Sequence, residues 1–349
     1  MNSHQHNLNN TRSEELESTE WPSLSILIVN WNSKDYLRKC LLSIELHGEG
    51  LASQIVVVDG GSFDGCDTML ADEFPYVEFV QAHENLGFAC SNNLGFERVT
   101  SEYLLLLNPD TELTPNALKC LLRASLENSQ SGIVGPRLLN SDGTLQASCV
   151  QPLPTPLNQA FDSDFLRRKL KLTWFLGKDG SMVGDTLTRV PAVSGAAMLM
   201  PSDLFRAIGG FDGAYFMYAE DMDLCAKAKR AGRSVLHEPR SLIVHHGEGS
   251  SSKTFNKFGV VMNLHALSLF MGRNFGSFAT ARFKFYILIS SLLRIPILNI
   301  LCIVSSKQRS ESIKRWQATA SWVLGKEKWC SNYIPAEAGK AELNSALGQ

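Results

Sequence analysis

Polar side chains follow several short apolar runs of this sequence at the point where each run stops. Asn30, Asp59 and Asn85 take such positions, and Asp110 comes just after the uncharged run 103–107. A short apolar run that ends at a turn is typical of a strand buried on both faces of a parallel sheet. Such sheets bind ligands beyond the carboxyl ends of their strands, where carboxylates can accept hydrogen bonds from ribose hydroxyls or hold a cation. The pattern favours a site for a base, a ribose and a diphosphate.

The same positions also have a purely structural explanation. Asn108-Pro109-Asp110 consists of turn-forming residues, and Asp59-Gly60-Gly61-Ser62 has the composition of an ordinary strand-to-helix turn. Glycines such as Gly61 serve a turn, but they also let a backbone approach a ligand closely. No G-x-G-x-x-G follows the first strand and no G-x-x-x-x-G-K-[ST] occurs, which argues against a nicotinamide or flavin fold and against a P-loop NTPase.

A second acidic group, Glu220, Asp221 and Asp223, stands at the start of a predicted helix whose other end, 227–230, is basic. This charge order suits the helix dipole, so part of the pattern is structural. The dipole does not explain three carboxylates at one helix tip with aromatic residues before them. Like charges raise one another's pKa, and such a group can supply a general base suited to neutral pH.

Two adjacent histidines, His245 and His246, end the predicted strand 242–244. A lone surface histidine usually has no ligand role, whereas a pair at the end of a strand is a candidate site for a metal or a phosphate. Both readings stay open on this pattern alone.

The elements that must position these residues alternate between strands and helices. Strands are predicted at 24–29, 55–58, 77–81, 103–107, 132–135, 193–200 and 242–244, and helices at 34–44, 64–74, 88–98, from 114 onward and from 202 onward. A hairpin with Asp142-Gly143 at its turn is predicted at 138–145, and a mobile insert at 151–184. Alternation of this kind predicts an α/β fold with a mostly parallel central sheet flanked by helices.

Composition limits the function classes. The chain has 349 residues, 44% hydrophobic and 19% charged, which excludes a wholly disordered protein and allows one large α/β domain with an appendage. A net charge of −2 gives no reason to expect a nucleic-acid partner. The polar residues 1–22 are expected to be a disordered lead-in rather than a signal peptide, and the eight dispersed cysteines to be thiols of a reducing, cytoplasmic compartment.

The segment 286–304 is almost uncharged, contains Arg294 and Pro296, and is flanked by basic residues. Its length just suffices for a membrane span, but a central arginine is costly there. We therefore expect an interfacial helix on a membrane surface, with a true span or a packing helix as alternatives. A lipid-linked acceptor would explain such a helix.

Taken in order, the motifs between Ser25 and about Ser252 resemble those of family 2 glycosyltransferases of the GT-A fold. The resemblance is greatest to the rhamnosyltransferase-type branch that builds bacterial surface polysaccharides. The motifs are Val29-Asn30-Trp31-Asn32, Asp59-Gly60-Gly61-Ser62, Glu84-Asn85-Leu86-Gly87-Phe88-Ala89 with Asn92-Asn93, Asn108-Pro109-Asp110, Ser194-Gly195-Ala196, Glu220-Asp221-Met222-Asp223-Leu224 and His245-His246.

The resemblance implies a role for each matched position. Asp221 would be the catalytic base of the Glu-Asp motif beside Glu220, and Asp110 with His245 or His246 would hold a Mn or Mg ion. The residues implied to bind the nucleotide sugar are Val29, Asn30, Asn32, Asp59, Gly61, Asn85, Gly87, Phe88, Asn92, Asn108, Ser194 and Gly195.

Two positions depart from the family pattern. Asn108 replaces the first Asp of the D-x-D motif, as in the rhamnosyltransferase-type branch, so the cation has one anionic ligand fewer. Gly60 replaces the Asn that is common after the second-strand Asp, which affects the base contacts. Spacing in the family favours His245 over His246 as the ligand.

The expected protein is an inverting glycosyltransferase at the cytoplasmic face of the inner membrane. It would move a sugar, with L-rhamnose from dTDP-rhamnose as a candidate, to a glycan or lipid-linked acceptor. We expect a GT-A domain at 23–252 and a C-terminal helical region at 253–349. The alternatives are a non-catalytic protein of the same fold that binds a nucleotide sugar or a partner, and a sugar nucleotidyltransferase. The second would normally open with a basic, glycine-rich loop where Asn30-Trp31-Asn32-Ser33 stands.

Overall fold

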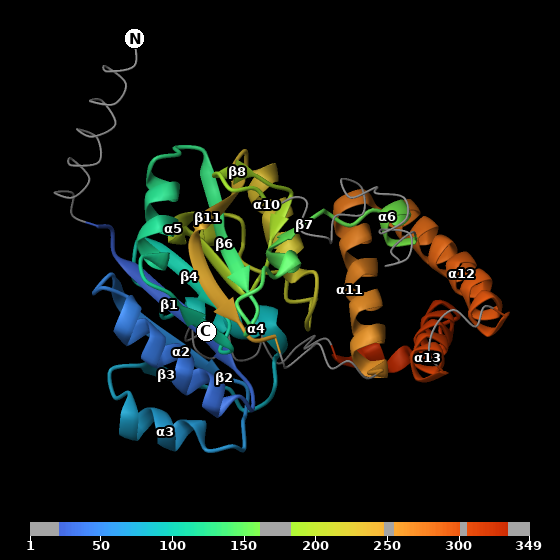
Figure 1. Ribbon diagram of the computed structural model, residues 1–349, viewed down its shortest axis with the longest axis horizontal. Coiled ribbons are helices and arrows are strands. Elements are labelled where there is room, and N and C mark those ends of the chain that lie inside the picture. The colour runs from blue at the N-terminus through green and yellow to red at the C-terminus, as the bar shows by residue number, and fades with distance from the viewer. Residues whose placement is uncertain (1–20, 161–182, 248–254, 301–305, 334–349) are drawn as a thin grey trace, which may run out of the picture.

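The computed structural model describes residues 21–160, 183–247, 255–300 and 306–333. A twisted sheet with helices packed around it forms one part of the molecule, and a group of long helices from the C-terminal part of the chain lies beside it (Figure 1). Residues 1–20, 161–182 and 301–305 lie outside the described residues. These ranges contain most of the expected lead-in 1–22, most of the expected insert 151–184 and the end of the segment 286–304.

The main sheet has nine strands in the order β3-β2-β1-β4-β10-β6-β11-β5, with β8 also paired to β11. The strands are β1 (Leu24–Asn30), β2 (Ala52–Asp59), β3 (Glu78–Gln81), β4 (Tyr103–Leu107), β5 (Thr111–Leu113), β6 (Ser131–Leu139), β8 (Thr188–Arg189), β10 (Ala197–Pro201) and β11 (Ser234–His245). Strands β3, β2, β1 and β4 are parallel, as are β6 and β11, whereas β10, β5 and β8 run antiparallel to their neighbours. The prediction of a mostly parallel sheet is confirmed.

Strand register brings the predicted polar positions to one edge. Asn30 pairs with Asp59, and Leu107 pairs with Ile28 of β1, so the ends of β2, β1 and β4 are level. Strand β4 lies in the middle of the sheet between β1 and β10, and its last four residues are 0–2% exposed. The apolar run therefore fixes where the chain reaches the surface, at Asn108 and Asp110.

The helices are α2 (Lys34–His47), α3 (Cys66–Glu73), α4 (Gly87–Phe96), α5 (Ala117–Leu126), α6 (Pro156–Ala160), α9 (Ser202–Ala207), α10 (Glu220–Arg230), α11 (Lys257–Phe275), α12 (Ser277–Ile300) and α13 (Ser306–Val323). The helix predicted from residue 114 begins only at Ala117, since Thr111–Leu113 pairs with β11 as β5 and Asn116 has a left-handed φ of 62°. The strand predicted at 193–200 is divided: Ala192–Val193 (β9) pairs with Val150–Gln151 (β7), and the turn 194–196 separates β9 from β10.

The C-terminal helices pack on the sheet domain through α10 and α11. Asn274 of α11 donates a 2.9 Å hydrogen bond to the buried Asp223 of α10, and Arg273 forms a 2.8 Å ion pair with Asp212. Helix α12 packs against α6, α11 and α13. In the described part of the chain, no helix has both the length and the hydropathy that a membrane span requires.

Candidate active site

One short turn, Ser194–Ala196, joins the two acidic motifs. The backbone N–H of Asn108 donates to the Ala196 carbonyl at 2.9 Å, and the backbone N–H of Gly195 donates to Asp221 Oδ2, also at 2.9 Å. A Cβ at Gly195 would lie 3.2 Å from Asp221 Cβ, tighter than ordinary contact, so the absence of a side chain there allows the close approach. The turn therefore fixes the end of β4 relative to the start of α10.

Asp221 is held by three donors. Gly195 N–H and Gln151 Nε2 donate to Oδ2 at 2.9 and 3.2 Å, and the Met222 N–H donates to Oδ1 at 2.7 Å. Burial raises the pKa of Asp221 above its ordinary value, although these hydrogen bonds act in the opposite direction. A carboxylate offers about four lone-pair sites, so one site remains for a further donor.

The backbone just before α10 is strained. Tyr218 and Ala219 both have left-handed φ angles, 71° and 62°, although neither is glycine. Each such residue costs about 1–2 kcal/mol, and conformations of this kind persist where the surroundings enforce them, often at functional sites. Here they aim the first residues of α10 at the turn 194–196.

The three carboxylates at the tip of α10 have different surroundings. Glu220 is buried, its Oε2 has no hydrogen-bond partner among the described residues, and its pKa is raised by burial and then by the negative charge of Asp221. Asp223 is 2% exposed and bonds to Asn274 instead. The predicted acidic cluster therefore reduces to a pair, Glu220 and Asp221, with Asp223 as a packing contact to α11.

Asp110 and His245 meet at the same edge of the sheet. His245 Nε2 lies 3.3 Å from Asp110 Oδ1 and 3.5 Å from Asn108 Nδ2. Burial by itself raises the pKa of Asp110, but His245 and the Gly247 N–H, 3.1 Å from Oδ2, more than offset this and leave the pKa below its ordinary value. Asp110 therefore carries its negative charge at neutral pH.

His246 points elsewhere, as alternation along an extended strand requires. Its Nε2 lies 2.7 Å from Glu112 Oε1, its Nδ1 lies 2.8 Å from Ser141 Oγ, and its ring lies 5.4 Å from the Tyr36 ring. Of the two histidines, the structure brings only His245 to Asp110.

Gln146 determines which nitrogen of His245 is available. Its Oε1 lies 2.8 Å from His245 Nδ1 and accepts the proton of that nitrogen, so Nε2 faces the Asp110 carboxylate, where it can donate a proton or, as the neutral ring, bind a cation. Two acceptors at 3.3 Å repel unless a cation, a proton or a metal, lies between or beside them. In addition, Asn108 Oδ1 is buried without a partner among the described residues. The donor set fits a divalent cation. No group of three or more His, Cys, Asp or Glu side chains that could hold a metal occurs in the described ranges.

Asp59 organises the loops around it. Asn30 Nδ2, Ser62 Oγ and Cys66 Sγ donate to its Oδ1, and the Ser62 N–H and Gln81 Nε2 donate to its Oδ2, at distances of 2.6–3.2 Å. Burial alone raises the pKa of Asp59, but these bonds outweigh it, so the pKa lies below its ordinary value. The side chain is 1% exposed. Direct contact between Asp59 and a nucleotide stays a prediction, and it requires a ligand to displace one of these donors.

The loop before α4 lies against the chain that precedes α10. Asn85 Oδ1 accepts a bond from the Gly87 N–H at 3.0 Å, and the Phe88 N–H donates to the Phe216 carbonyl at 2.8 Å. Gly87 has a φ of 76°, and a Cβ there would lie 2.3 Å from the Phe216 oxygen. Asn92 is 1% exposed and donates to the Phe88 carbonyl, so it stabilises α4 from within.

Sequence reasoning missed Gln146 and Gln151. Both lie in the segment after the hairpin 138–145, which carries no family motif, yet they orient His245 and Asp221 respectively. Only the three-dimensional position of the hairpin reveals them.

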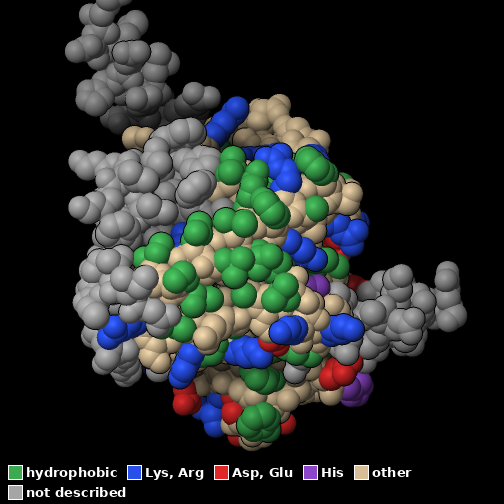
Figure 2. Space-filling model, turned by 90° about the vertical axis from the view of Figure 1, so that its right-hand side faces the viewer, with side chains coloured by type: hydrophobic (Ala, Val, Ile, Leu, Met, Phe, Trp, Pro, Cys, Tyr) green, Lys and Arg blue, Asp and Glu red, His purple; other side chains and the backbone are tan. Residues whose placement is uncertain are grey.

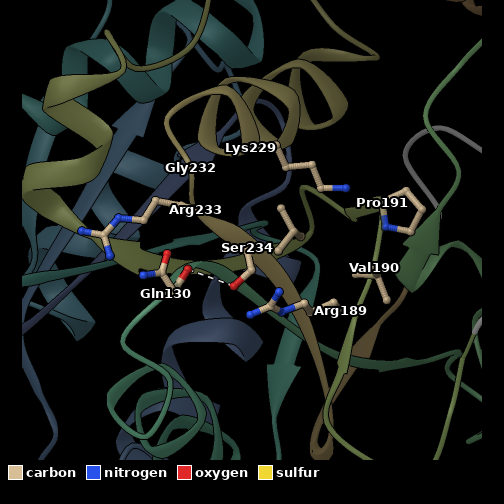
Figure 3. Close-up of a pocket in the computed structure, with 9 residues that line it drawn as sticks. Gln130, Arg189, Val190, Pro191, Lys229, Gly232, Arg233 and Ser234 are labelled. Atoms are coloured by element: carbon tan, nitrogen blue, oxygen red, sulfur yellow. Dashed lines mark hydrogen bonds between the residues drawn. The ribbon is translucent and has the colours of Figure 1, made fainter.

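A hollow of about 710 Å³ lies at the opposite edge of the sheet, where β6 and β11 begin (Figure 3). Its lining is basic, with Arg189, Lys229 and Arg233, and contains none of the predicted site residues. Lys229 lies in the last turn of α10, where a cation complements the helix dipole. The feature is therefore separate from the candidate site.

Known proteins resemble this chain in both sequence and fold. Residues 25–182 match the family model described as Glycosyl transferase family 2. N-acetylglucosaminyl-diphospho-decaprenol L-rhamnosyltransferase of Mycobacterium tuberculosis is 24% identical over 241 residues, covering 66% of this chain and 78% of the relative. Rhamnosyltransferase WbbL of Escherichia coli is 24% identical over 250 residues, covering 66% and 86%. Low-salt glycan biosynthesis hexosyltransferase Agl10 of Haloferax volcanii is 27% identical over 219 residues, covering 62% and 64%.

Two solved structures share the fold at 15% identity. A mannosyltransferase from Pyrobaculum calidifontis in complex with GDP-Man and Mn²⁺ has a TM-score of 0.52 and covers 92% of this chain and 94% of its own. GalNAc-T7 with UDP, GalNAc and Mn²⁺ has a TM-score of 0.53 and covers 91% and 59%. The resemblance inferred from the motifs is confirmed: the protein has a GT-A-type fold, and its residues 25–182 match the family model of glycosyltransferase family 2.

Proposed function

We propose that this protein is an inverting glycosyltransferase that moves a sugar from a nucleotide donor to a glycan or lipid-linked acceptor in bacterial surface polysaccharide biosynthesis. L-rhamnose from dTDP-rhamnose is the favoured donor, because relatives from Mycobacterium and Escherichia are named as rhamnosyltransferases. In this proposal residues 23–252 form the catalytic domain and 253–349 a C-terminal helical region.

The observation that carries the proposal is the turn Ser194–Ala196. Through Asn108 and Gly195 it holds the end of β4, which leads to Asp110, and the Asp221 carboxylate in a fixed relation. Transfer with inversion needs both functions: a base on the acceptor hydroxyl and positive charge near the departing nucleoside diphosphate.

Asp221 is the proposed base. Its fourth lone-pair site can accept the proton of the acceptor hydroxyl, whose oxygen then attacks the anomeric carbon from the side opposite the diphosphate. The raised pKa of Asp221 increases its basicity. The buried Glu220, whose pKa is also raised, stays neutral more readily and limits charge repulsion beside the base.

Asp110 and His245 are the proposed protein ligands of a divalent cation, Mn or Mg. Such an ion, when bound, neutralises charge on the leaving diphosphate. Gln146, as the acceptor of the Nδ1 proton, holds the ring so that His245 Nε2 is aimed at Asp110. With so few protein ligands, the remaining coordination positions are left for water and phosphate oxygens, as is usual for Mg at nucleotide sites.

The nucleotide sugar would occupy the edge formed by the ends of β1, β2 and β4. Asn85 is exposed there, and the loop with Asn32 is pinned to the next loop by two hydrogen bonds, Asn32 N–H to Ser62 Oγ at 2.7 Å and Phe63 N–H to Asn32 Oδ1 at 3.0 Å. We assign Val29, Asn30, Gly61, Gly87, Phe88, Asn92, Ser194 and Gly195 to the walls and supports of this site. A place of action at the cytoplasmic face of the inner membrane follows from the lipid-linked acceptor proposed here.

The test is release of nucleoside diphosphate from a panel of dTDP-, UDP- and GDP-sugars with Mn²⁺ or Mg²⁺. We compare the native chain with Asp221→Asn, and Asp203→Asn serves as the matched control because its side chain is 97% exposed on α9. We expect one donor to be hydrolysed slowly, with a loss of about 10²–10⁴-fold in Asp221→Asn, the usual contribution of a general base, and no loss in the control. Thermal melting of each variant separates loss of chemistry from loss of fold.

If Asp221→Asn hydrolyses the donor at the rate of the native chain, Asp221 is not the catalytic base. If no donor is hydrolysed, calorimetric titration with the matching nucleotides decides the class of protein. Metal-dependent binding would be explained either by an enzyme that requires its acceptor for turnover or by a non-catalytic binding protein of the same fold. Absence of binding would refute the enzyme proposal.

A further inference from the structure

Helix α12 has one face that packs within the protein. Phe283, Ile287 and Ser291, spaced by one turn each, are 0–4% exposed. The Phe283 ring lies 6.2 Å from the Trp322 ring of α13 in an edge-on arrangement. This row attaches α12 to its neighbours α11 and α13.

The opposite face of α12 is also apolar, but it is open. Its exposed side chains are Phe278 (75%), Phe285 (58%), Ile289 (40%), Leu292 (56%), Leu293 (58%) and Ile297 (47%). At 3.6 residues per turn Phe278, Phe285, Ile289 and Leu292 project away from the buried row, and Leu293 and Ile297 lie at its flank. Figure 2 views the side of the molecule where α11–α13 lie and shows hydrophobic side chains spread across it with Lys and Arg among them. Soluble monomers rarely expose so continuous an apolar row without a partner.

The segment that contains this face carries charge of one sign, although its Lys257 and Arg273 pair with Glu327 and Asp212 from outside it. Between Glu248 and Glu311 the chain has eight Lys and Arg residues and no Asp or Glu. Arg282, in the second turn of α12, lies over the rings of Phe278 and Tyr286, 5.8 and 5.7 Å from their centroids. A cation held against aromatic rings beside exposed apolar side chains is the arrangement of interfacial helices.

We propose that the open face of α12, defined by Phe278, Phe285, Ile289, Leu292, Leu293 and Ile297, lies on the surface of an anionic lipid bilayer. The proposal rests on the proposed function in one respect: a lipid-linked acceptor gives the membrane contact its purpose. It deepens that function by naming the surface that would bring the active site to such an acceptor. The apolar side chains enter the boundary between headgroups and acyl chains, and the basic residues meet the anionic headgroups.

Two other occupants fit the observations less well. A second copy of the chain would bring the same basic segment against itself, with no carboxylate between residues 249 and 310 to compensate. For a membrane span, none of the described helices combines the required length with the required hydropathy. Within α12, Arg294 is directed at the Trp316 ring of α13, 4.4 Å from its centroid, and not at lipid.

The test is co-sedimentation of the full chain with vesicles of phosphatidylcholine alone or with phosphatidylglycerol added. The variant Phe285→Ser/Leu292→Ser removes two members of the open face. The matched control is Leu46→Ser/Leu126→Ser, which removes apolar side chains that are 74% and 42% exposed on α2 and α5. Gel filtration and donor hydrolysis without acceptor are measured on the same samples.

We expect binding to the anionic vesicles only, and a fall of about tenfold or more in the partition coefficient for the α12 variant, since each half-buried Leu or Phe is worth several-fold. The control keeps its binding. Arg282→Gln costs about fivefold, the usual effect of one basic residue near such a surface. Donor hydrolysis stays unchanged in the α12 variant, so failure of this proposal is distinct from failure of the proposed function.

Equal binding of the α12 variant and the control would overturn the proposal. So would a native chain that ignores vesicles of either kind. A native dimer that becomes monomeric only in the α12 variant, without vesicle binding, would assign the face to a second copy instead.

Discussion

The two adjacent histidines allow a direct test of the proposed metal site, because they differ in direction and not in position along the chain. His245 faces Asp110 and His246 faces Glu112, at 3.3 and 2.7 Å. We compare His245→Asn with His246→Asn, and add Gln146→Leu, which leaves His245 in place but removes the acceptor for its Nδ1 proton.

The expected magnitudes follow from the contacts. Loss of an outer partner that orients a ligating histidine costs about 10–100-fold in metal affinity, so Gln146→Leu falls in this range. Replacement of His245 itself costs at least about 100-fold by the same reasoning. His246→Asn costs no more than about fivefold, because His246 pairs with Glu112 and not with Asp110, and a pair near the surface contributes about 0–1 kcal/mol.

The assay is titration with Mn²⁺, followed by the disappearance of the free-ion electron paramagnetic resonance signal in the presence of the nucleoside diphosphate. The half-saturating Mn²⁺ concentration for donor hydrolysis gives an independent value. The reasoning is refuted if His246→Asn weakens Mn²⁺ binding more than His245→Asn, or if Gln146→Leu leaves it unchanged.

Two further predictions concern stability. Gly87→Ala places a Cβ 2.3 Å from the Phe216 oxygen at a φ of 76° and should lower the free energy of unfolding by at least about 2 kcal/mol in denaturant titrations. Gly143→Ala, at a φ of 79° with open space around it, should cost less, and equal costs would contradict the clash. Glu327, whose pKa is lowered to about 2 by its bonds to Lys257 and other partners, stabilises the folded state fully above pH 4.5 and loses this as pH falls toward 2. Glu327→Gln should therefore be less stable than the native chain at pH 7 and nearly equal to it near pH 2, and a gap that persists there would refute the assignment.

The sequence predicted the sheet well where an apolar run is followed by a polar loop, as at β1, β2 and β4. These strands are buried on both faces, so their uniformly apolar composition is enough to indicate a buried strand. It failed at β11, of which only the last residues were expected, because the first half contains the charged Glu238 and Arg240. Those two side chains, two residues apart, neutralise one another in a pair with two contacts of 2.8–2.9 Å, which lets the charged Glu238 lie buried within a strand.

The site was predicted in outline and not in its connections. The motifs placed Asp110 after a strand and Asp221 at the start of a helix, but the turn that joins them and the glutamines that orient His245 and Asp221 depend on the three-dimensional arrangement. The direction of each histidine depends on the register of β11 against β5, in which His245 pairs with Thr111. Pairing partners are set by the whole sheet, so the sequence left His245 and His246 undecided.

The bond between Asp223 and Asn274 has a consequence for how this architecture can be recombined. Asp223 lies two residues after Asp221 on the same helix and is buried at 2% exposure with Asn274 of α11 as its partner. A chimaera that exchanges the C-terminal helices of two relatives, or a truncation at the end of the catalytic domain, would leave this carboxylate facing solvent or an unmatched side chain, directly below the proposed base. Exchange of the C-terminal helices of this protein therefore has to carry the Asp223–Asn274 contact across the junction.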